Sequence, residues 1–316
     1  MEDDSYVYKP RPDYEMLLQN RYWGSQLLNK PLPLLRNLLS WLFSGLVYMC
    51  AVCAVIPLVS ILWTILRRGL PGLKWTVLTA IPAPVGVTDV PDGFGNAIMG
   101  TLMIVGVSSL VSIPLGILVG IYLAEFNQGS LFDRYLNSAV RFAQRILSSI
   151  PSIIIGVFAY GVIVFTTKKF SAFAGSFALS IIMLPVVALT TEEAMKRVPN
   201  NLRLAAASLG GNRFQVTSQI VIKSALNGIT TGCLLAIARA AGETAPLIFT
   251  ALNSPTWPEG LFAPAPSLPV LIFKYASSPY DVQKNLAWTA ALVLLLLVLI
   301  GNMASRFFVN RRLVSK

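Results

Sequence analysis

Runs of about twenty mostly apolar residues recur along the chain, and each is long enough to cross a bilayer as a helix. The residues before 38 are polar and contain several prolines. They lack the basic start and short apolar core of a signal peptide, so they are predicted to form a tail rather than a cleaved leader. The pattern predicts an all-α polytopic membrane protein with six transmembrane helices. These are expected at about 38–66, 97–124, 146–167, 170–190, 225–252 and 286–308.

Composition agrees with this pattern and removes several classes of function. Of the 316 residues, 55% are hydrophobic and 12% are charged, whereas soluble domains carry about 25% charged residues. The chain has no histidine and no G-x-x-x-x-G-K-[ST] loop, which excludes histidine-based catalysis and a phosphate-cradling nucleotide loop of its own. Cys50 and Cys53 form a C-x-x-C pair, but no second pair completes a zinc site, so they are interpreted as buried thiols. We predict no catalytic residue, metal site or cofactor in this chain.

The distribution of lysine and arginine predicts the orientation in the membrane. With both termini inside, 17 basic residues fall in cytoplasmic segments and 7 in outer loops, and Arg239 within a span completes the total of 25. Cytoplasmic loops are normally enriched in these residues, so both termini are predicted to be cytoplasmic. The net charge of +11 then follows mostly from topology and requires no nucleic-acid partner. The outer residues are Arg67, Arg68, Lys74, Lys168, Lys169, Lys274 and Lys284.

The most polar long connection after the N-terminal tail lies between the fourth and fifth spans, at 191–223. Within it, LRLAAASL contains good helix formers, Asn200 or Asn201 can cap the start, and Gly210-Gly211 can end the helix. A short cytoplasmic helix over 201–210 is therefore predicted. Spacing alone leaves open whether this helix is a docking element or a plain connector.

The stretch AIARAAGETAPLIF at 236–249 places two opposite charges inside an apolar span. Arg239 and Glu243 are four residues apart, so they share a helix face about one turn apart. A charge left alone at mid-bilayer costs at least about 2.5 kcal/mol, so such residues face protein or water and usually find a partner. The pair is either a structural ion pair in the bundle or part of a polar pathway. Pro246 is expected to kink the span just beyond it.

Several motifs carry a resemblance to a known family. Residues 204–210, LAAASLG, follow the coupling-loop pattern of an acidic residue, two alanines, three variable residues and glycine, except that Leu204 replaces the acid. This ordered set resembles the phosphate permease subunits of binding-protein-dependent ABC importers over roughly 95–312. The other matching stretches are GNAIMGTL (95–102), PLGILVGIYLAEF (114–126), IPSIIIGVF (150–158), LPVVALTTEEAMKRVP (184–199), ARAAGETAPLIFTAL (238–252) and SLPVLIFKYASSPYD (267–281).

The resemblance implies a non-catalytic membrane subunit with a MetI-like permease core. Its partners would be a second permease subunit, two cytoplasmic ATPase subunits that bind ATP, and an extracytoplasmic phosphate-binding protein. The implied organisation is a tail at 1–37, a first helix at 38–66, an outer loop at 67–94, a five-helix core at 95–312 with a coupling loop at 191–213, and a tail at 313–316. The implied ATPase-coupling residues are Arg203, Leu204, Ala205, Ala206 and Gly210.

Under this resemblance Arg239 would line the phosphate path, with Glu243 as its resting counter-charge and Thr244 beside them. A guanidinium suits that task because it stays charged and binds oxyanions through two parallel hydrogen bonds. The structural ion pair remains the alternative. Glu192 and Glu193 are predicted to lie in a solvated turn. Glu125 is expected to be an interfacial anchor, while the G-x-x-x-G at Gly116 and Gly120 predicts close helix packing.

Other functions remain to be separated from this one. Sulfate or molybdate import is the nearest alternative substrate. A self-contained secondary transporter or channel would commonly show two repeated halves, and no convincing repeat is present. A membrane-embedded enzyme would need a nucleophile–base set or a metal cluster, and the sequence supplies neither.

Overall fold

The computed structural model describes residues 34–84, 86, 90–126 and 131–314. Every secondary-structure element in these ranges is helical, which confirms the predicted class. The chain divides into two compact units, residues 1–62 and 63–316. The boundary falls inside α2 (Leu34–Gly69), which extends beyond the predicted 38–66 at both ends. Cys50 and Cys53 are exposed on α2, so the prediction that they are buried is wrong.

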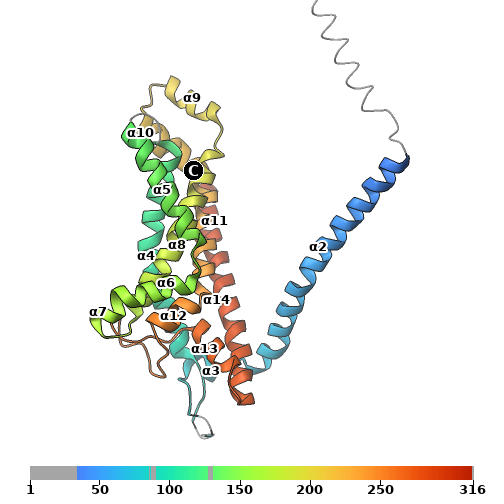
Figure 1. Cartoon of the computed structure of the whole chain (residues 1–316), viewed down its shortest axis with the longest axis vertical. Helices are drawn as coiled ribbons and strands as arrows, with labels where there is room; N and C mark the ends of the chain where they lie inside the picture. Colours follow the sequence, from blue (N-terminus) through green and yellow to red (C-terminus); the bar gives the residue numbers. More distant parts are fainter. Residues whose placement is uncertain (1–33, 85, 87–89, 127–130, 315–316) are drawn as a thin grey trace, which may run out of the picture. The chain divides into compact units, whose positions relative to one another are not determined.

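The second unit contains a helical bundle with short elements at each end (Figure 1). In Figure 1, α9 and α10 lie at one end, and α3 and α13 lie toward the other. Short π-helical segments at Tyr160–Val164 and Val216–Val221 join neighbouring helices. The remaining elements are the 3-10 turn Leu70–Gly72, α3 (Trp75–Thr79), α4 (Gly95–Glu125), α5 (Leu131–Ser149), α6 (Ser152–Ala159), α7 (Phe165–Thr167), α8 (Ala172–Lys196), α9 (Asn200–Ser208), α10 (Arg213–Gln215), α11 (Ile222–Ala241), α12 (Ala245–Thr250), α13 (Leu268–Ala276) and α14 (Asp281–Val314).

The membrane crossings agree with the prediction except for the third and the fifth, and the break in the fifth is described below. Five described helices, those containing α2, α4, α8, α11 and α14, are long and apolar enough to cross a membrane. α5 and the α6–α7 segment make a sixth crossing if they are counted as one span, and they meet at 103°. The predicted continuous helix at 146–167 is therefore wrong. Pro151 lies at the break, where it lacks an N–H and disfavours helical geometry in the preceding residue.

α8 is the central helix of the bundle, in contact with α4, α5, α6, α11 and α12. Its tightest crossing is with α4, where two glycines remove the side chains that would hold the helices apart. A Cβ at Gly116 would lie 2.7 Å from Val187 Cβ, and one at Gly120 would lie 2.6 Å from Thr191 Cβ. The G-x-x-x-G pair thus allows the close packing that the sequence predicted.

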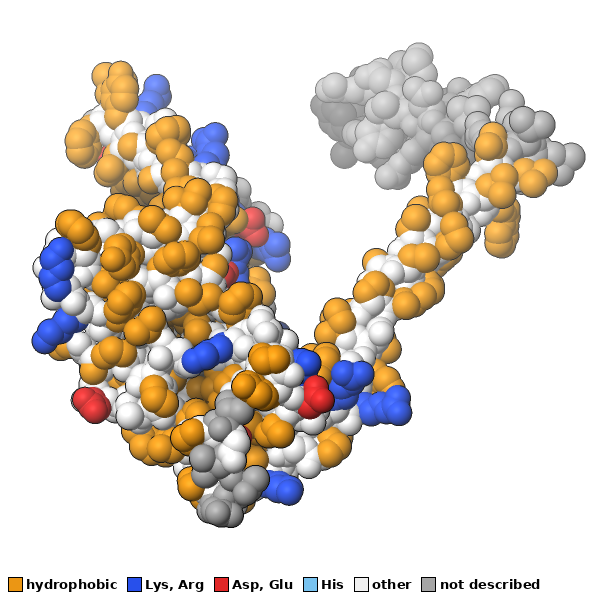
Figure 2. Space-filling view, turned by 60° about the horizontal axis from the view of Figure 1, so that its bottom comes forward, with side chains coloured by type: hydrophobic (Ala, Val, Ile, Leu, Met, Phe, Trp, Pro, Cys, Tyr) orange, Lys and Arg blue, Asp and Glu red, His pale blue; other side chains and the backbone are white. Residues whose placement is uncertain are grey.

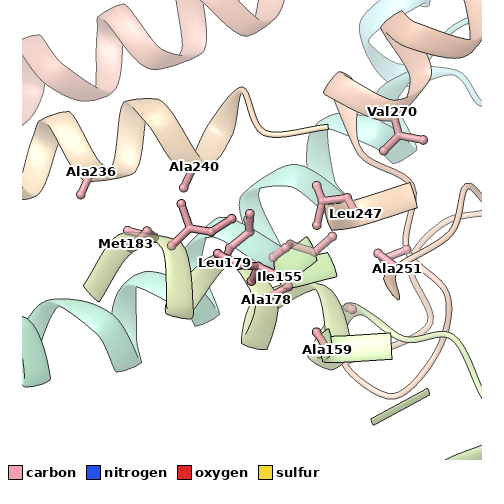
Figure 3. Close-up of a cluster of buried hydrophobic side chains, with 14 of the residues drawn as sticks. Ile155, Ala159, Ala178, Leu179, Met183, Ala236, Ala240, Leu247, Ala251 and Val270 are labelled. Atoms are coloured by element: carbon pink, nitrogen blue, oxygen red, sulfur yellow. The ribbon is translucent and has the colours of Figure 1, made fainter. Parts of the chain in front are cut away.

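The largest hydrophobic core cluster gathers side chains from α8 and the helices around it. Figure 3 shows Ala236 and Ala240 of α11 near Met183 and Leu179 of α8. Leu247 of α12 belongs to the same cluster, as do Ile155, Ala159 and Ala251. Hydrophobic side chains also cover much of the face shown in Figure 2, as expected for a surface in contact with lipid.

Two side chains at the start of α4 hold the long connection between α12 and α13. Asn96 Nδ2 donates hydrogen bonds to the carbonyls of Ser254 and Thr256, at 3.2 Å each. Thr101 Oγ1 accepts a hydrogen bond from the Leu268 N–H at 2.8 Å. Both side chains are buried, so this loop is fixed against the bundle by polar contacts rather than by helix continuity.

Replacing Gly120 by valine is expected to destabilise the bundle, because the new side chain would overlap Thr191 and the Ala188 carbonyl. Overpacking of this kind costs about 1–3 kcal/mol, so the melting temperature of the purified protein should fall. Gly106→Val is the matched control on the same helix, since no atom lies within 4 Å of the added Cβ there. Equal melting temperatures for the two variants would contradict the close contact between α4 and α8.

Candidate translocation site and docking helix

The fifth predicted span is interrupted at the position of its two charges. α11 ends at Ala241 and α12 begins at Ala245, so the helical path breaks over 242–244. The kink expected at Pro246 is instead a break over the three residues 242–244, and the proline lies in the first turn of α12, where its missing N–H removes no helical hydrogen bond. α6 packs directly on this turn, since a Cβ at Gly156 would lie 2.6 Å from Pro246 Cα.

The structure brings Arg239 and Glu243 together across this break. Arg239 Nε lies 3.5 Å from Glu243 Oε1, at the long limit of a hydrogen bond. The Arg239 side chain is 58% exposed and that of Glu243 is 17% exposed. Thr244 is half-buried beside them, and its carbonyl accepts hydrogen bonds from the N–H groups of Leu247 and Ile248. The contact is therefore loose, with most of the guanidinium turned away from the chain.

Within the second unit, residues 63–314, no described element covers the face of α11 that carries Arg239. Thr231, Leu235 and Arg239 are exposed at four-residue spacing. The neighbouring face carries the buried Ala236 and Ala240, which pack on α8 (Figure 3). A charged group at this depth in a span requires protein, water or a ligand against it. Within the second unit, this face of α11 therefore lacks a covering surface for its charged side chain.

α9 confirms the short helix predicted between the fourth and fifth spans. The predicted cap by Asn200 or Asn201 is wrong, because the helix begins one residue earlier, with Pro199 as N-cap and no side-chain cap. At the other end Gly210 has φ +83, its N–H donates to Ala207 O, and Gly211 N–H donates to Ala206 O. These two hydrogen bonds form a Schellman motif, so the glycine stop is confirmed.

The outer surface of α9 and the turn after it is apolar. Leu204 is 66% exposed and Leu209 is 90% exposed, and Leu202 and Phe214 are also exposed. Ala205 is exposed, whereas Ala206 is half-buried on the same side as Arg203. Exposed apolar side chains clustered at the end of a bundle are typical of a surface that another protein covers.

Arg203 faces the bundle rather than this outer surface. Its Nη1 donates to Glu125 Oε1 at the end of α4, and its Nη2 donates to Met195 O near the end of α8, at 2.9 Å. The Glu125 side chain is only 9% exposed. Glu125 is therefore a largely buried partner of the loop that carries α9, and its role as an interfacial anchor stays a prediction. Sequence spacing offered no signal for this pair, which is separated by 78 residues.

A second buried carboxylate joins α5 to α8. Glu192 is 3% exposed, and its Oε1 lies 2.7 Å from Arg141 Nη2 and 2.5 Å from Lys196 Nζ. Arg141 Nε also donates to Asn137 Oδ1 at 3.1 Å. The predicted solvated turn is therefore wrong for Glu192. Glu193 is solvated as predicted, with its side chain 56% exposed and 4.0 Å from Arg197, but it lies in the last turn of α8 and not in a loop.

Comparison with known proteins now places this arrangement in a family. Residues 116–314 match the family model described as "Binding-protein-dependent transport system inner membrane component". The match covers more than half of the sequence, and the chain belongs to this family. The membrane-spanning helices and this family together make it a multi-pass membrane protein.

Within this family, the chain is clearly similar to phosphate permease subunits. The chain is 41% identical over 272 residues to the phosphate transport system permease protein PstA of Haemophilus influenzae, covering 86% of this chain and 94% of that protein. It is 37% identical over 247 residues to the probable PstA of Methanocaldococcus jannaschii, covering 78% and 85%. The resemblance predicted from the motifs is confirmed.

Solved structures share the fold at low identity. The MetNI methionine ABC transporter in an inward-facing conformation gives a TM-score of 0.58 at 20% identity, covering 69% of this chain and 94% of that chain. A bacterial alginate ABC transporter gives 0.59 at 13% identity, covering 86% and 94%. These similarities support the predicted MetI-like architecture.

Glu192→Gln is expected to lower the stability of the protein, because it weakens the contacts of a buried carboxylate with Arg141 and Lys196. Hydrogen bonds to charged groups contribute about 1.5–3 kcal/mol, so the melting temperature should fall measurably. Glu193→Gln is the adjacent control, where the exposed pair with Arg197 contributes little. If both variants melted like the parent protein, the Glu192 cluster would not stabilise the α5–α8 contact.

Proposed function

We propose that this chain is a transmembrane permease subunit of an ATP-driven importer and that it moves inorganic phosphate across the membrane. The observation that carries the proposal is Arg239, a permanent cation on the uncovered face of α11 beside a break in a membrane span. The PstA relatives support phosphate as the substrate.

The chemistry of the pair suits an oxyanion that must bind and then leave. Arg239 stays charged at any physiological pH and can bind phosphate oxygens through two parallel hydrogen bonds. Its 3.5 Å contact with Glu243 is loose enough to open for an anion and to close again when the anion has passed. Glu243 thereby limits how tightly phosphate is held, and a transport path must release what it binds. Thr244 adds a hydroxyl beside the same break.

The remaining surfaces suggest the rest of the complex. The exposed face of α11 would be covered by a second permease subunit, so that Arg239 faces a path between the two chains. The apolar outer surface of α9 would dock on one of two ATPase subunits, which bind the ATP. Ala205 and Gly210 would lie at that contact, together with Leu204. A phosphate-binding protein would deliver the substrate at the opposite end, where α13 and the loop after α12 lie. This arrangement places α9 and both termini in the cytoplasm.

Exchanging the two charges, Arg239→Glu with Glu243→Arg, tests the transport role directly. The exchange keeps an ion pair but moves the cation from the last turn of α11 into the break that follows it. We expect the complex to assemble and phosphate uptake to be largely lost. Uptake is measured as radiolabelled phosphate entering proteoliposomes that contain the permeases, the ATPase subunits and ATP, with the binding protein added outside.

Arg239→Lys is the companion variant, because it keeps the charge at its original position and loses the planar fork. It should assemble normally and transport poorly. Near-parent uptake by the exchanged protein would show that the pair is a structural contact in the bundle. If the parent complex took up sulfate or molybdate but not phosphate, the substrate would be one of those oxyanions instead.

The docking surface is tested by Leu204→Asp combined with Leu209→Asp. Both side chains are exposed, so the bundle should fold as before. The two aspartates should reduce the amount of ATPase subunit that co-purifies with the permease. Burying an unpaired charge in the core of an interface costs free energy. Ser208→Asp is the control for each single change, since it adds one negative charge on the same helix without removing an apolar side chain. Full recovery of the ATPase with the double variant would exclude this surface as the docking site.

A further inference from the structure

α9 has very little packing of its own to hold it in place. None of its nine residues is buried, and it lies between Pro199 and the glycine turn at Gly210. A helix this short is only marginally stable without tertiary contacts. Its position relative to the membrane helices therefore depends on a few side-chain contacts, and Arg203 supplies two of them.

Arg203 joins three helices at one point. One terminal nitrogen donates to the Glu125 carboxylate that ends α4, and the other donates to the carbonyl of Met195 in the last turn of α8. The Arg203 side chain is 22% exposed and that of Glu125 is 9% exposed, so solvent screens this contact less than an ordinary surface pair. The two nitrogens reach different acceptors because the guanidinium is a rigid fork, which a lysine ammonium is not.

A second arginine, from the segment that follows α9 in the sequence, also contacts the end of α4. Arg213, at the start of α10, donates through Nη2 to the backbone carbonyl of Glu125. Its guanidinium also lies 5.5 Å from the centre of the Phe126 ring, within the range of a cation–π contact. The segments before and after the Schellman turn thus both contact the end of α4.

We propose that Glu125 and Arg203 are positioning residues that transmit the movement of docked α9 to the paired helices α4 and α8. The inference rests on the proposed function, in which an ATPase subunit moves α9. α4 and α8 are in close contact through Gly116 and Gly120, so a displacement applied at their ends shifts them together. Without the Arg203 contacts, α9 would be linked to the bundle only through its backbone connections. It could then move without shifting α4 and α8.

The first test measures coupling in the reconstituted complex, as phosphate transported per ATP hydrolysed. Arg203→Gln and Glu125→Gln should each lower this ratio by about 2- to 30-fold, the range over which residues along a coupling network act. The double variant should be no worse than the more impaired single variant, because both changes remove one shared contact. Arg203→Lys should fall between the parent and Arg203→Gln. Arg197→Gln is the matched control, since its pair with Glu193 is 4.0 Å apart and exposed.

The second test is independent of transport. Hydrogen–deuterium exchange of the backbone amides at 200–208 should be faster in Arg203→Gln and in Arg203→Lys than in the parent complex, and unchanged in Arg197→Gln. Parent-like exchange together with a parent-like coupling ratio would overturn the inference, as would strictly additive losses in the double variant. A parent complex that hydrolyses ATP but moves no phosphate would overturn the proposed function instead, and the exchange result would then decide the Arg203 contact.

Discussion

The close approach of helix backbones around α8 is the constraint on which the rest of the structure depends. Lipid supplies no hydrophobic drive for one helix to bind another, so association relies on van der Waals contact and on small residues that permit it. Gly116 and Gly120 provide this on α4, and Gly228 and Gly232 provide it on α11, where an added Cβ would clash with Ala194 and Thr190. Three long helices thereby form one block. This block positions the break beside Arg239 and also the ends of α4 and α8 that hold α9.

The helices on either side of both interruptions, α5 and α6 and then α11 and α12, pack on α8. Backbone that is not helical is tolerated within a membrane only where protein or water covers it. α6, which follows the break at Pro151, packs against α12, which follows the break at 242–244. The contact is made by Gly156 of α6 and Pro246 of α12. The N–H groups of Gly242 and Glu243 still donate to carbonyls of the last turn of α11. The helix therefore opens at this point while the N–H groups of Gly242 and Glu243 stay paired.

Local patterns allowed much of this structure to be predicted from the sequence. Apolar runs marked α4, α8 and α14, and the spacing of Arg239 and Glu243 correctly predicted that their side chains meet, although Glu243 lies just beyond the end of α11. The features that were missed depend on distant partners. Glu125 and Arg203 are 78 residues apart, and Arg141 and Glu192 are 51 apart, so no local pattern could show that either carboxylate is buried.

Two further errors came from neighbouring residues rather than distant ones. The third span looked continuous because its apolar residues run past Pro151, and α5 was missed because arginines recur along it. The cap at Asn200 failed because Pro199, with ψ 140, already takes the extended geometry of an N-cap and leaves Asn200 inside the first turn. In both cases a proline decided the helix boundary.

The two sides of α9 have separate duties, and this separation has a consequence for partner choice. The inward side, with Arg203 and Ala206, sets where the helix sits, while on the outward side Leu204, and Leu209 just after the helix, are largely exposed. Side chains on the outward side can therefore be exchanged without moving the helix itself. Such a helix is modular: under the proposed function, a different outer surface grafted onto the same anchor would change which ATPase subunit it binds without moving the helices that hold it.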